Sequence, residues 1–144
     1  MKYYIALFII FSTTLLSAQS WQKSFEEALE ITKDEDKVLI LVFAGSDWCA
    51  PCIKLDKDVW QSDEFKAYAD KNFVLYKADF PRKKANRLND DVAEENGKLA
   101  EKYNPKGHFP LVVLLNKKGE VLATTGYKKL SAEAYITHLN DLLK

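Results

Sequence analysis

Several features that would place this chain in a specialised class are scarce or missing. Its 144 residues include two cysteines, five glycines and four prolines, too few for a disulfide scaffold or a low-complexity linker. Lysine plus arginine and aspartate plus glutamate each number 21, so no net positive charge is available to bind nucleic acid. No internal repeat is visible. With 47% apolar and 12% aromatic residues, the sequence predicts one ordered globular domain.

The first 18 residues differ from the rest of the chain. Lys2 provides a short positive segment, and an unbroken apolar run follows from Tyr3 to Phe11. This run is about half as long as the roughly 20 residues that a transmembrane helix needs. The pattern predicts a signal peptide over residues 1–18, cleaved after Ala18 or two residues later. Residues 19–144 would then be exported, periplasmic or secreted, without a membrane span, where disulfides can form.

Hydrophobic patterning predicts alternating helices and strands in the mature domain. Val38 to Phe43 form an apolar run without alternation, which is typical of a strand buried on both faces of a sheet. The expected elements are helix 24–34, strand 38–43, helix 50–60, helix 62–71, strand 73–79, a helical stripe late in the polar segment 80–102, strand 111–115, strand 120–125 and a helix from Ser131. This order predicts an α/β fold whose central mixed sheet has a parallel core, helices on both faces, and a C-terminal antiparallel hairpin followed by a helix.

One motif points to specific chemistry, namely Trp48-Cys49-Ala50-Pro51-Cys52 between the most buried strand and a helix. A thiolate is the reactive form of cysteine, and the N–H groups at a helix N-terminus favour that charged form. Pro51 fits the first helical turn, where its missing N–H costs nothing. Cys49 is therefore predicted to attack, and Cys52, one turn deeper and more buried, to resolve the mixed disulfide.

Two other interpretations of the cysteine pair carry less weight. A purely structural disulfide that closes four residues would stabilise the fold by only about 2 kcal/mol, against nearly 5 for a long loop. A zinc site needs about four ligands, and the two histidines, His108 and His138, are thirty positions apart. Redox chemistry is thus favoured over a structural pair and over a metal site, and no metal ligand is assigned.

At these residues the chain resembles the thioredoxin superfamily, in particular its exported members. The resemblance covers nearly the whole mature chain and includes the buried strand, Trp48-Cys49-Ala50-Pro51-Cys52, the strand ending at Asp79, Leu99–Tyr103, Phe109-Pro110, the hairpin and Gly126. It implies the thioredoxin fold, thiol–disulfide exchange, and a cis proline facing the redox pair at Pro110. Trp48 and Phe109 would form an apolar lip beside it that binds substrate.

Two departures from the thioredoxin pattern carry predictions. Phe43 stands where thioredoxin has a buried aspartate, so the Cys52 thiol would lose its proton to water or to a nearby surface group. Lys54 and Asp56 could serve this proton transfer, although charged residues on a helix are usually just solvated, and Asp47 and Lys54 are the first two residues to mutate if an internal base exists. Residues 80–98 are longer than the equivalent connection in thioredoxin, and we expect a surface excursion that tunes partner choice without packing into the core.

The remaining candidates are weaker. His108 is predicted either to lie near the redox pair or to be an exposed loop residue, and His138 to lie on the surface. Trp21 and Trp60 are expected in the core. The basic run Arg82 to Lys84 is too short to indicate a polyanion site and is interpreted as a solvated loop.

The function that these residues support is exchange of protein thiols and disulfides through a mixed disulfide. No dissociable cofactor is needed, because the cysteines carry the electrons. The expected partners are protein thiol or disulfide substrates and a redox partner protein, with no nucleic acid, and the chain is expected to be a monomer. The alternative is a thioredoxin-fold binding module or chaperone with an incidental cysteine pair. Reductant, isomerase and oxidant all stay open, because about 30 mV in potential is only about 1.4 kcal/mol.

Overall fold

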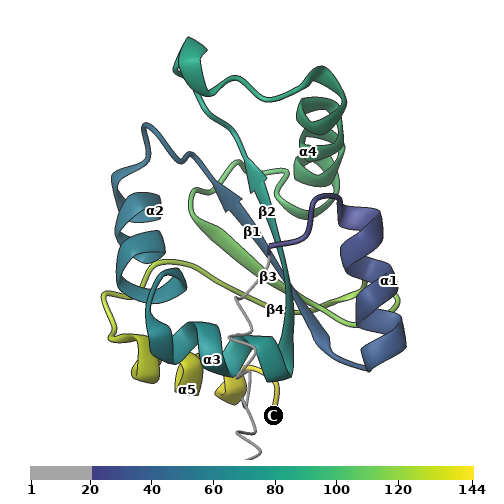
Figure 1. Cartoon of the computed structure of the whole chain (residues 1–144), viewed down its shortest axis with the longest axis vertical. Helices are drawn as coiled ribbons and strands as arrows, with labels where there is room; N and C mark the ends of the chain where they lie inside the picture. Colours follow the sequence, from purple (N-terminus) through teal and green to yellow (C-terminus); the bar gives the residue numbers. More distant parts are fainter. Residues whose placement is uncertain (1–20) are drawn as a thin grey trace, which may run out of the picture.

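The computed structural model describes residues 21–144 and contains a sheet between two layers of helices (Figure 1). The predicted signal peptide, residues 1–18, lies outside the described residues. In chain order the elements are α1 Phe25–Glu35, β1 Val38–Ala44, α2 Ala50–Leu55, a π-helical turn Asp56–Trp60, α3 Asp63–Asn72, β2 Phe73–Asp79, a 3₁₀ turn Lys84–Asn86, α4 Asp90–Tyr103, β3 Leu111–Leu115, β4 Val121–Thr125 and α5 Ala132–Asp141.

The sheet is mixed, with strand order β2-β1-β3-β4. β1 runs parallel to β2, whereas β3 is antiparallel to both β1 and β4. The predicted mixed sheet and C-terminal hairpin are confirmed, but the parallel core is limited to one pair of strands. The physical reason is that β3 starts where β2 ends: Asp79 pairs with Ala44, and Leu111 pairs with the adjacent Phe43. The connection through α4 thus returns the chain to the same end of the sheet.

The two faces of β1 belong to two separate core clusters. Side chains alternate along a strand, so Ile40, Val42 and Ala44 pack toward α2, α3 and α5, while Leu39, Leu41 and Phe43 pack toward α1 and α4. Residues 39–43 are each at most 1% exposed. The unbroken apolar run in the sequence therefore follows from helices on both faces, as Figure 1 shows.

Three serines begin helices as the sequence predicts. In each case the side-chain oxygen accepts a backbone N–H from the residue three positions on, which satisfies a donor that the helix leaves unpaired. These pairs are Ser24 with Glu27, Ser62 with Phe65, and Ser131 with Ala134.

The prediction that residues 80–98 form a surface excursion is wrong for their second half. From Asp90 onward the chain is α4, which packs on the sheet and buries Asn96 and Leu99. The Asn96 amide donates to the Asp79 carbonyl at 3.1 Å, and its side-chain oxygen accepts from the Tyr76 hydroxyl at 2.8 Å. A buried asparagine looks like a surface residue in a sequence because its hydrogen-bond partners are distant along the chain. The excursion is therefore residues 80–89 only.

Candidate redox site

The two cysteines lie at the start of α2, directly beyond the end of β1. Cys49 is the N-cap residue of α2, and its backbone N–H donates to the Gly45 carbonyl at 2.9 Å. The backbone N–H of Cys52 points at Cys49 Sγ, 3.3 Å away. The two sulfurs are bonded at 2.08 Å, and Pro51 lies in the first turn of the helix. The pair can therefore open and close at a helix N-terminus.

Burial does not distinguish the two cysteines. Each is 5% exposed, so the prediction that Cys52 is more buried than Cys49 is wrong for the disulfide form. Bonded sulfur atoms share one environment, which equalises their exposure. The two cysteines differ in position. Cys49 Sγ accepts the backbone N–H of Cys52, whereas Cys52 lies one turn inside the helix and lines a pocket along it.

The ring of the half-buried Trp48 lies directly against Gly45, in the turn that precedes the cysteines. A Cβ atom at Gly45 would lie 2.2 Å from the indole Cε2, so only glycine leaves room for the ring. The indole Nε1–H donates to the Phe80 carbonyl at 2.7 Å. Gly45 and this hydrogen bond together fix the ring beside Cys49.

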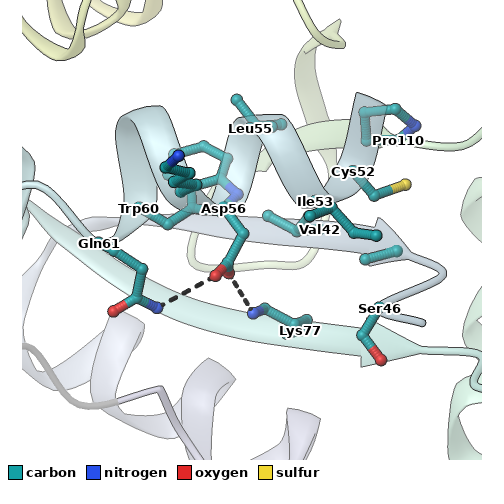
Figure 2. Close-up of a pocket in the computed structure, with 12 residues that line it drawn as sticks. Val42, Ser46, Cys52, Ile53, Leu55, Asp56, Trp60, Gln61, Lys77 and Pro110 are labelled. Atoms are coloured by element: carbon teal, nitrogen blue, oxygen red, sulfur yellow. Dashed lines mark hydrogen bonds and ion pairs between the residues drawn. The ribbon is translucent and has the colours of Figure 1, made fainter. Parts of the chain in front are cut away.

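Phe109 and Pro110 come from the loop before β3 and complete an apolar edge. The Phe109 ring makes edge-to-face contacts with Trp48 and with Phe80, at centroid distances of 5.4 Å and 5.6 Å. The Phe109–Pro110 peptide bond is cis, as the resemblance implied. Pro110 lies at the Cys52 end of the pocket (Figure 2). The structure thus brings together the five residues predicted for the site.

A pocket of about 290 Å³ runs from Cys52 along α2. Figure 2 shows Cys52 and Pro110 at one end and a polar group at the other. In that group the Lys77 ammonium donates to the Asp56 carboxylate at 2.8 Å, and the Gln61 amide donates to it at 3.3 Å. The rest of the lining is mostly apolar, so Asp56 and Lys77 hold their charges in a partly desolvated place.

Phe43 does not fill the space beside the resolving cysteine. It is fully buried in the cluster between the sheet, α1 and α4, whereas Cys49 and Cys52 belong to the cluster on the opposite face. The substitution of a phenylalanine for an acid therefore removes the carboxylate without placing the aromatic ring against the thiols.

The ranking of proton acceptors from the sequence needs correction. Asp47 holds a neighbouring loop through three hydrogen bonds, and these donors, first the Arg82 N–H and next the Asn86 amide, lower the pKa of its carboxyl group. Lys54 is exposed and does not line the pocket. Asp56 is the carboxylate that lines the pocket with Cys52. Their spacing of four residues on one helix was the available signal.

The other aromatic and histidine candidates have structural places. His108 is exposed, and Asn104 holds its backbone N–H and carbonyl. His138, predicted to lie on the surface, is half-buried, with Nε2 2.8 Å from the Thr125 hydroxyl. Trp60 is a core residue, and the half-buried Trp21 contacts its edge at a centroid distance of 6.1 Å.

Within residues 21–144, no three His, Cys, Asp or Glu side chains gather closely enough to hold a metal ion. Within the same residues, no helix combines the length and apolar character needed to span a bilayer.

Comparison with known proteins agrees with this geometry. Residues 20–117 match the family described as thioredoxin-like. The disulfide bond reductase DsbH of Chlamydia pneumoniae is 36% identical over 124 residues, which cover 86% of this chain and 72% of the relative. A solved structure of a DsbH oxidoreductase superposes with a TM-score of 0.80 at 32% identity, covering 96% of this chain and 94% of that one. A disulphide isomerase from Xylella fastidiosa, at 22% identity, covers 90% and 99% with a TM-score of 0.62 and shares the fold.

Proposed function

This chain belongs to the thioredoxin-like family and is a thiol–disulfide oxidoreductase, and from that premise we propose that it is an exported reductase of protein disulfides. The observation that carries the proposal is the Cys49–Cys52 disulfide, placed at the N-terminus of α2 between an apolar edge and a pocket. The relative that is 36% identical is itself a disulfide bond reductase, which supports this direction of electron flow.

The reaction proceeds in two exchanges. The Cys49 thiolate attacks one sulfur of the substrate disulfide, so a Cys49–substrate S–S bond forms and the other substrate sulfur leaves as a thiolate. The Cys52 thiolate then attacks Cys49 Sγ, which forms the Cys49–Cys52 disulfide and releases the second substrate thiolate. The substrate gains two electrons and the chain loses two. A dithiol redox partner protein returns them and completes the cycle.

The surroundings of Cys49 support a reductase rather than a strong oxidant. An oxidant is strong when its reduced form is highly stabilised, chiefly through its thiolate. Within residues 21–144, the one hydrogen bond that Cys49 Sγ accepts comes from the Cys52 backbone N–H. A thiolate held only by a helix N-terminus is less stabilised than one that also has a cationic partner, and it gives its electrons away more readily.

Trp48, Phe109 and Pro110 supply the substrate-binding edge in this proposal. The Trp48 and Phe109 rings are in contact, and each of the three residues is partly exposed beside the disulfide. A polypeptide substrate must bring its sulfur to Cys49 across this edge, where apolar contact excludes water from the reacting sulfurs.

The assignment of the two cysteines is tested by labelling and by trapping. Brief alkylation of the reduced protein at neutral pH should modify Cys49 and spare Cys52, as peptide mapping would show. Cys52→Ser should accumulate covalent mixed disulfides with protein substrates, and Cys49→Ser, the matched control, should accumulate few. Preferential labelling of Cys52 would reverse the roles, and unimpaired function of the double serine variant would favour a binding module instead.

Export of a monomeric mature chain also belongs to the proposal. Intact-mass measurement of the exported protein should give a chain that starts at Gln19 or close to it, and size exclusion should give one chain per particle. A membrane-bound chain that retains residues 1–18 would contradict the predicted signal peptide.

A further inference from the structure

Residues 80–89, between β2 and α4, are tied to the redox motif rather than merely solvated. The Asp47 carboxylate accepts hydrogen bonds from the backbone N–H groups of Arg82 and Lys83, both at 2.9 Å, and from the Asn86 amide at 3.0 Å. Asp47 lies two residues before Cys49. Figure 1 shows this segment extending beyond the same end of the sheet as the connection from β1 to α2.

A second attachment passes through Trp48. Its Nε1–H donates to the Phe80 carbonyl, and the Arg82 guanidinium lies 3.8 Å from the centroid of its ring. A guanidinium over an indole face at this distance is a cation–π contact. Because Trp48 immediately precedes Cys49, the Arg82 cation lies at the edge of the redox site.

The segment presents more positive charge than the neighbouring carboxylates neutralise. Arg82, Lys83 and Lys84, which we call the basic rim, are exposed, and none of them forms an ion pair with another residue in 21–144. Two carboxylates lie beside the rim and keep their negative charges: Asp47, and Asp79, which accepts from the backbone N–H and the hydroxyl of Ser46. Three cations against two carboxylates leave the rim with an excess of positive charge, although the whole chain has no net charge.

We propose that the basic rim binds aspartate and glutamate side chains that flank the target disulfide, so that the enzyme prefers disulfides in acidic protein segments. This inference rests on the proposed reductase function and adds its substrate class. A substrate sulfur at Cys49 places neighbouring substrate residues over Trp48, within reach of Arg82 and the adjacent lysines. Single contacts between exposed charges are weak, so the three cations together should give about a tenfold preference at low salt. Asp47 acts as a positioning residue, because it holds the rim in place.

The preference can be measured with two synthetic peptides that contain the same internal disulfide. One carries four glutamates beside the cysteines and the other carries four lysines. Wild-type protein should reduce the acidic peptide with a kcat/KM about ten times higher than that for the basic peptide at low ionic strength. Half-molar salt should bring this ratio close to one, because it shortens the range of charge interactions to a few Å.

Charge reversal tests whether the preference for the acidic peptide comes from the basic rim. The triple variant Arg82→Glu, Lys83→Glu and Lys84→Glu should invert the ratio in favour of the basic peptide. The matched control carries the same change in net charge at the opposite end of the sheet, through Lys33→Glu, Lys71→Glu and Lys118→Glu, all exposed. This control should keep most of the wild-type ratio. Inversion in both triple variants would show a net-charge effect and would overturn the rim as the binding surface.

The Asp47→Ala variant tests the positioning role. It keeps all three cations but releases the segment, so the ratio should fall at least threefold, and Asp47→Asn should restore part of it because the amide oxygen still accepts an N–H. An unchanged ratio in Asp47→Ala would overturn that role.

Failure of this proposal is distinguishable from failure of the reductase function. If wild-type protein reduces a small aromatic disulfide and both peptides, with equal kcat/KM for the peptides, the rim proposal alone is wrong. If it reduces none of the three, the proposed function is wrong.

Discussion

Lys77→Met is the substitution that probes most directly how Cys52 loses its proton. Lys77 donates to Asp56 at 2.8 Å, and the two side chains are 27% and 35% exposed, so in the wild-type pocket their charges largely cancel. Methionine keeps a similar length and removes the cation. The Asp56 charge then loses its ion-pair partner in the pocket that Cys52 lines, with only the exposed Lys57 left as a cation there, and it disfavours a second negative charge on the thiolate.

The size of the effect follows from the helix spacing. Residues four apart on a helix have Cβ atoms about 5–6 Å apart, and two unit charges about 6 Å apart interact by about 3 kcal/mol at an effective dielectric constant of about 20. Because solvent reaches both side chains, this interaction energy is reduced two- to threefold, to about 1 kcal/mol. The pH midpoint of the resolving step should therefore rise by about 0.7–1 unit, and the step should slow several-fold at neutral pH.

The assay starts from Cys49 joined to a chromogenic aromatic thiol, prepared at low pH. Stopped-flow jumps to pH values from mildly acidic to strongly alkaline record release of the thiol as Cys52 attacks. Lys54→Met, on the same helix but outside the pocket, is the matched control and should leave the profile in place. The double variant Lys77→Met, Asp56→Asn removes both charges and should move the midpoint back. A Lys77→Met profile that superimposes on the wild type, or shifts to lower pH, would refute the electrostatic account.

Two further predictions concern the scaffold of the site. Asn96→Ala removes two buried hydrogen bonds and should lower the free energy of unfolding by about 1–3 kcal/mol in urea titration; a loss below about 0.5 kcal/mol would contradict the role of this residue in joining α4 to the sheet. Gly45→Ala puts a methyl group into the Trp48 ring and should cost about 1–3 kcal/mol and change tryptophan fluorescence, whereas Gly97→Ala, which meets nothing within 4 Å, should not destabilise.

The sequence predicted the elements that rest on local signals. The unbroken apolar run at β1, the serine caps and the placement of Cys49 and Cys52 at a strand-to-helix junction depend on neighbours along the chain, and the structure has each of them. The direction of β3 was predicted less well, because it depends on where the connection from β2 returns. α4 sets that path. Its inner face includes the buried polar residue Asn96, so a hydrophobicity pattern identifies that face poorly.

The contacts that shape the site could not be predicted for the same reason. Asp47 and Arg82 are 35 positions apart, and Lys77 meets Asp56 across 21 positions. Each of these side chains looks like an ordinary solvated charge in the sequence. Only the fold shows that one pair fastens a basic loop beside Trp48 and the other places opposite charges in the pocket of Cys52.

The reduction potential of the purified mature protein tests the central proposal most directly. The protein is equilibrated in thiol–disulfide buffers of graded potential, and the fraction of reduced Cys49–Cys52 is counted by mass after alkylation. A Cys49 thiolate held by the helix N-terminus alone predicts a potential of about −230 mV or lower, in the range of reductants such as thioredoxin at about −270 mV. A potential near about −120 mV, typical of a strong oxidant, would contradict the account.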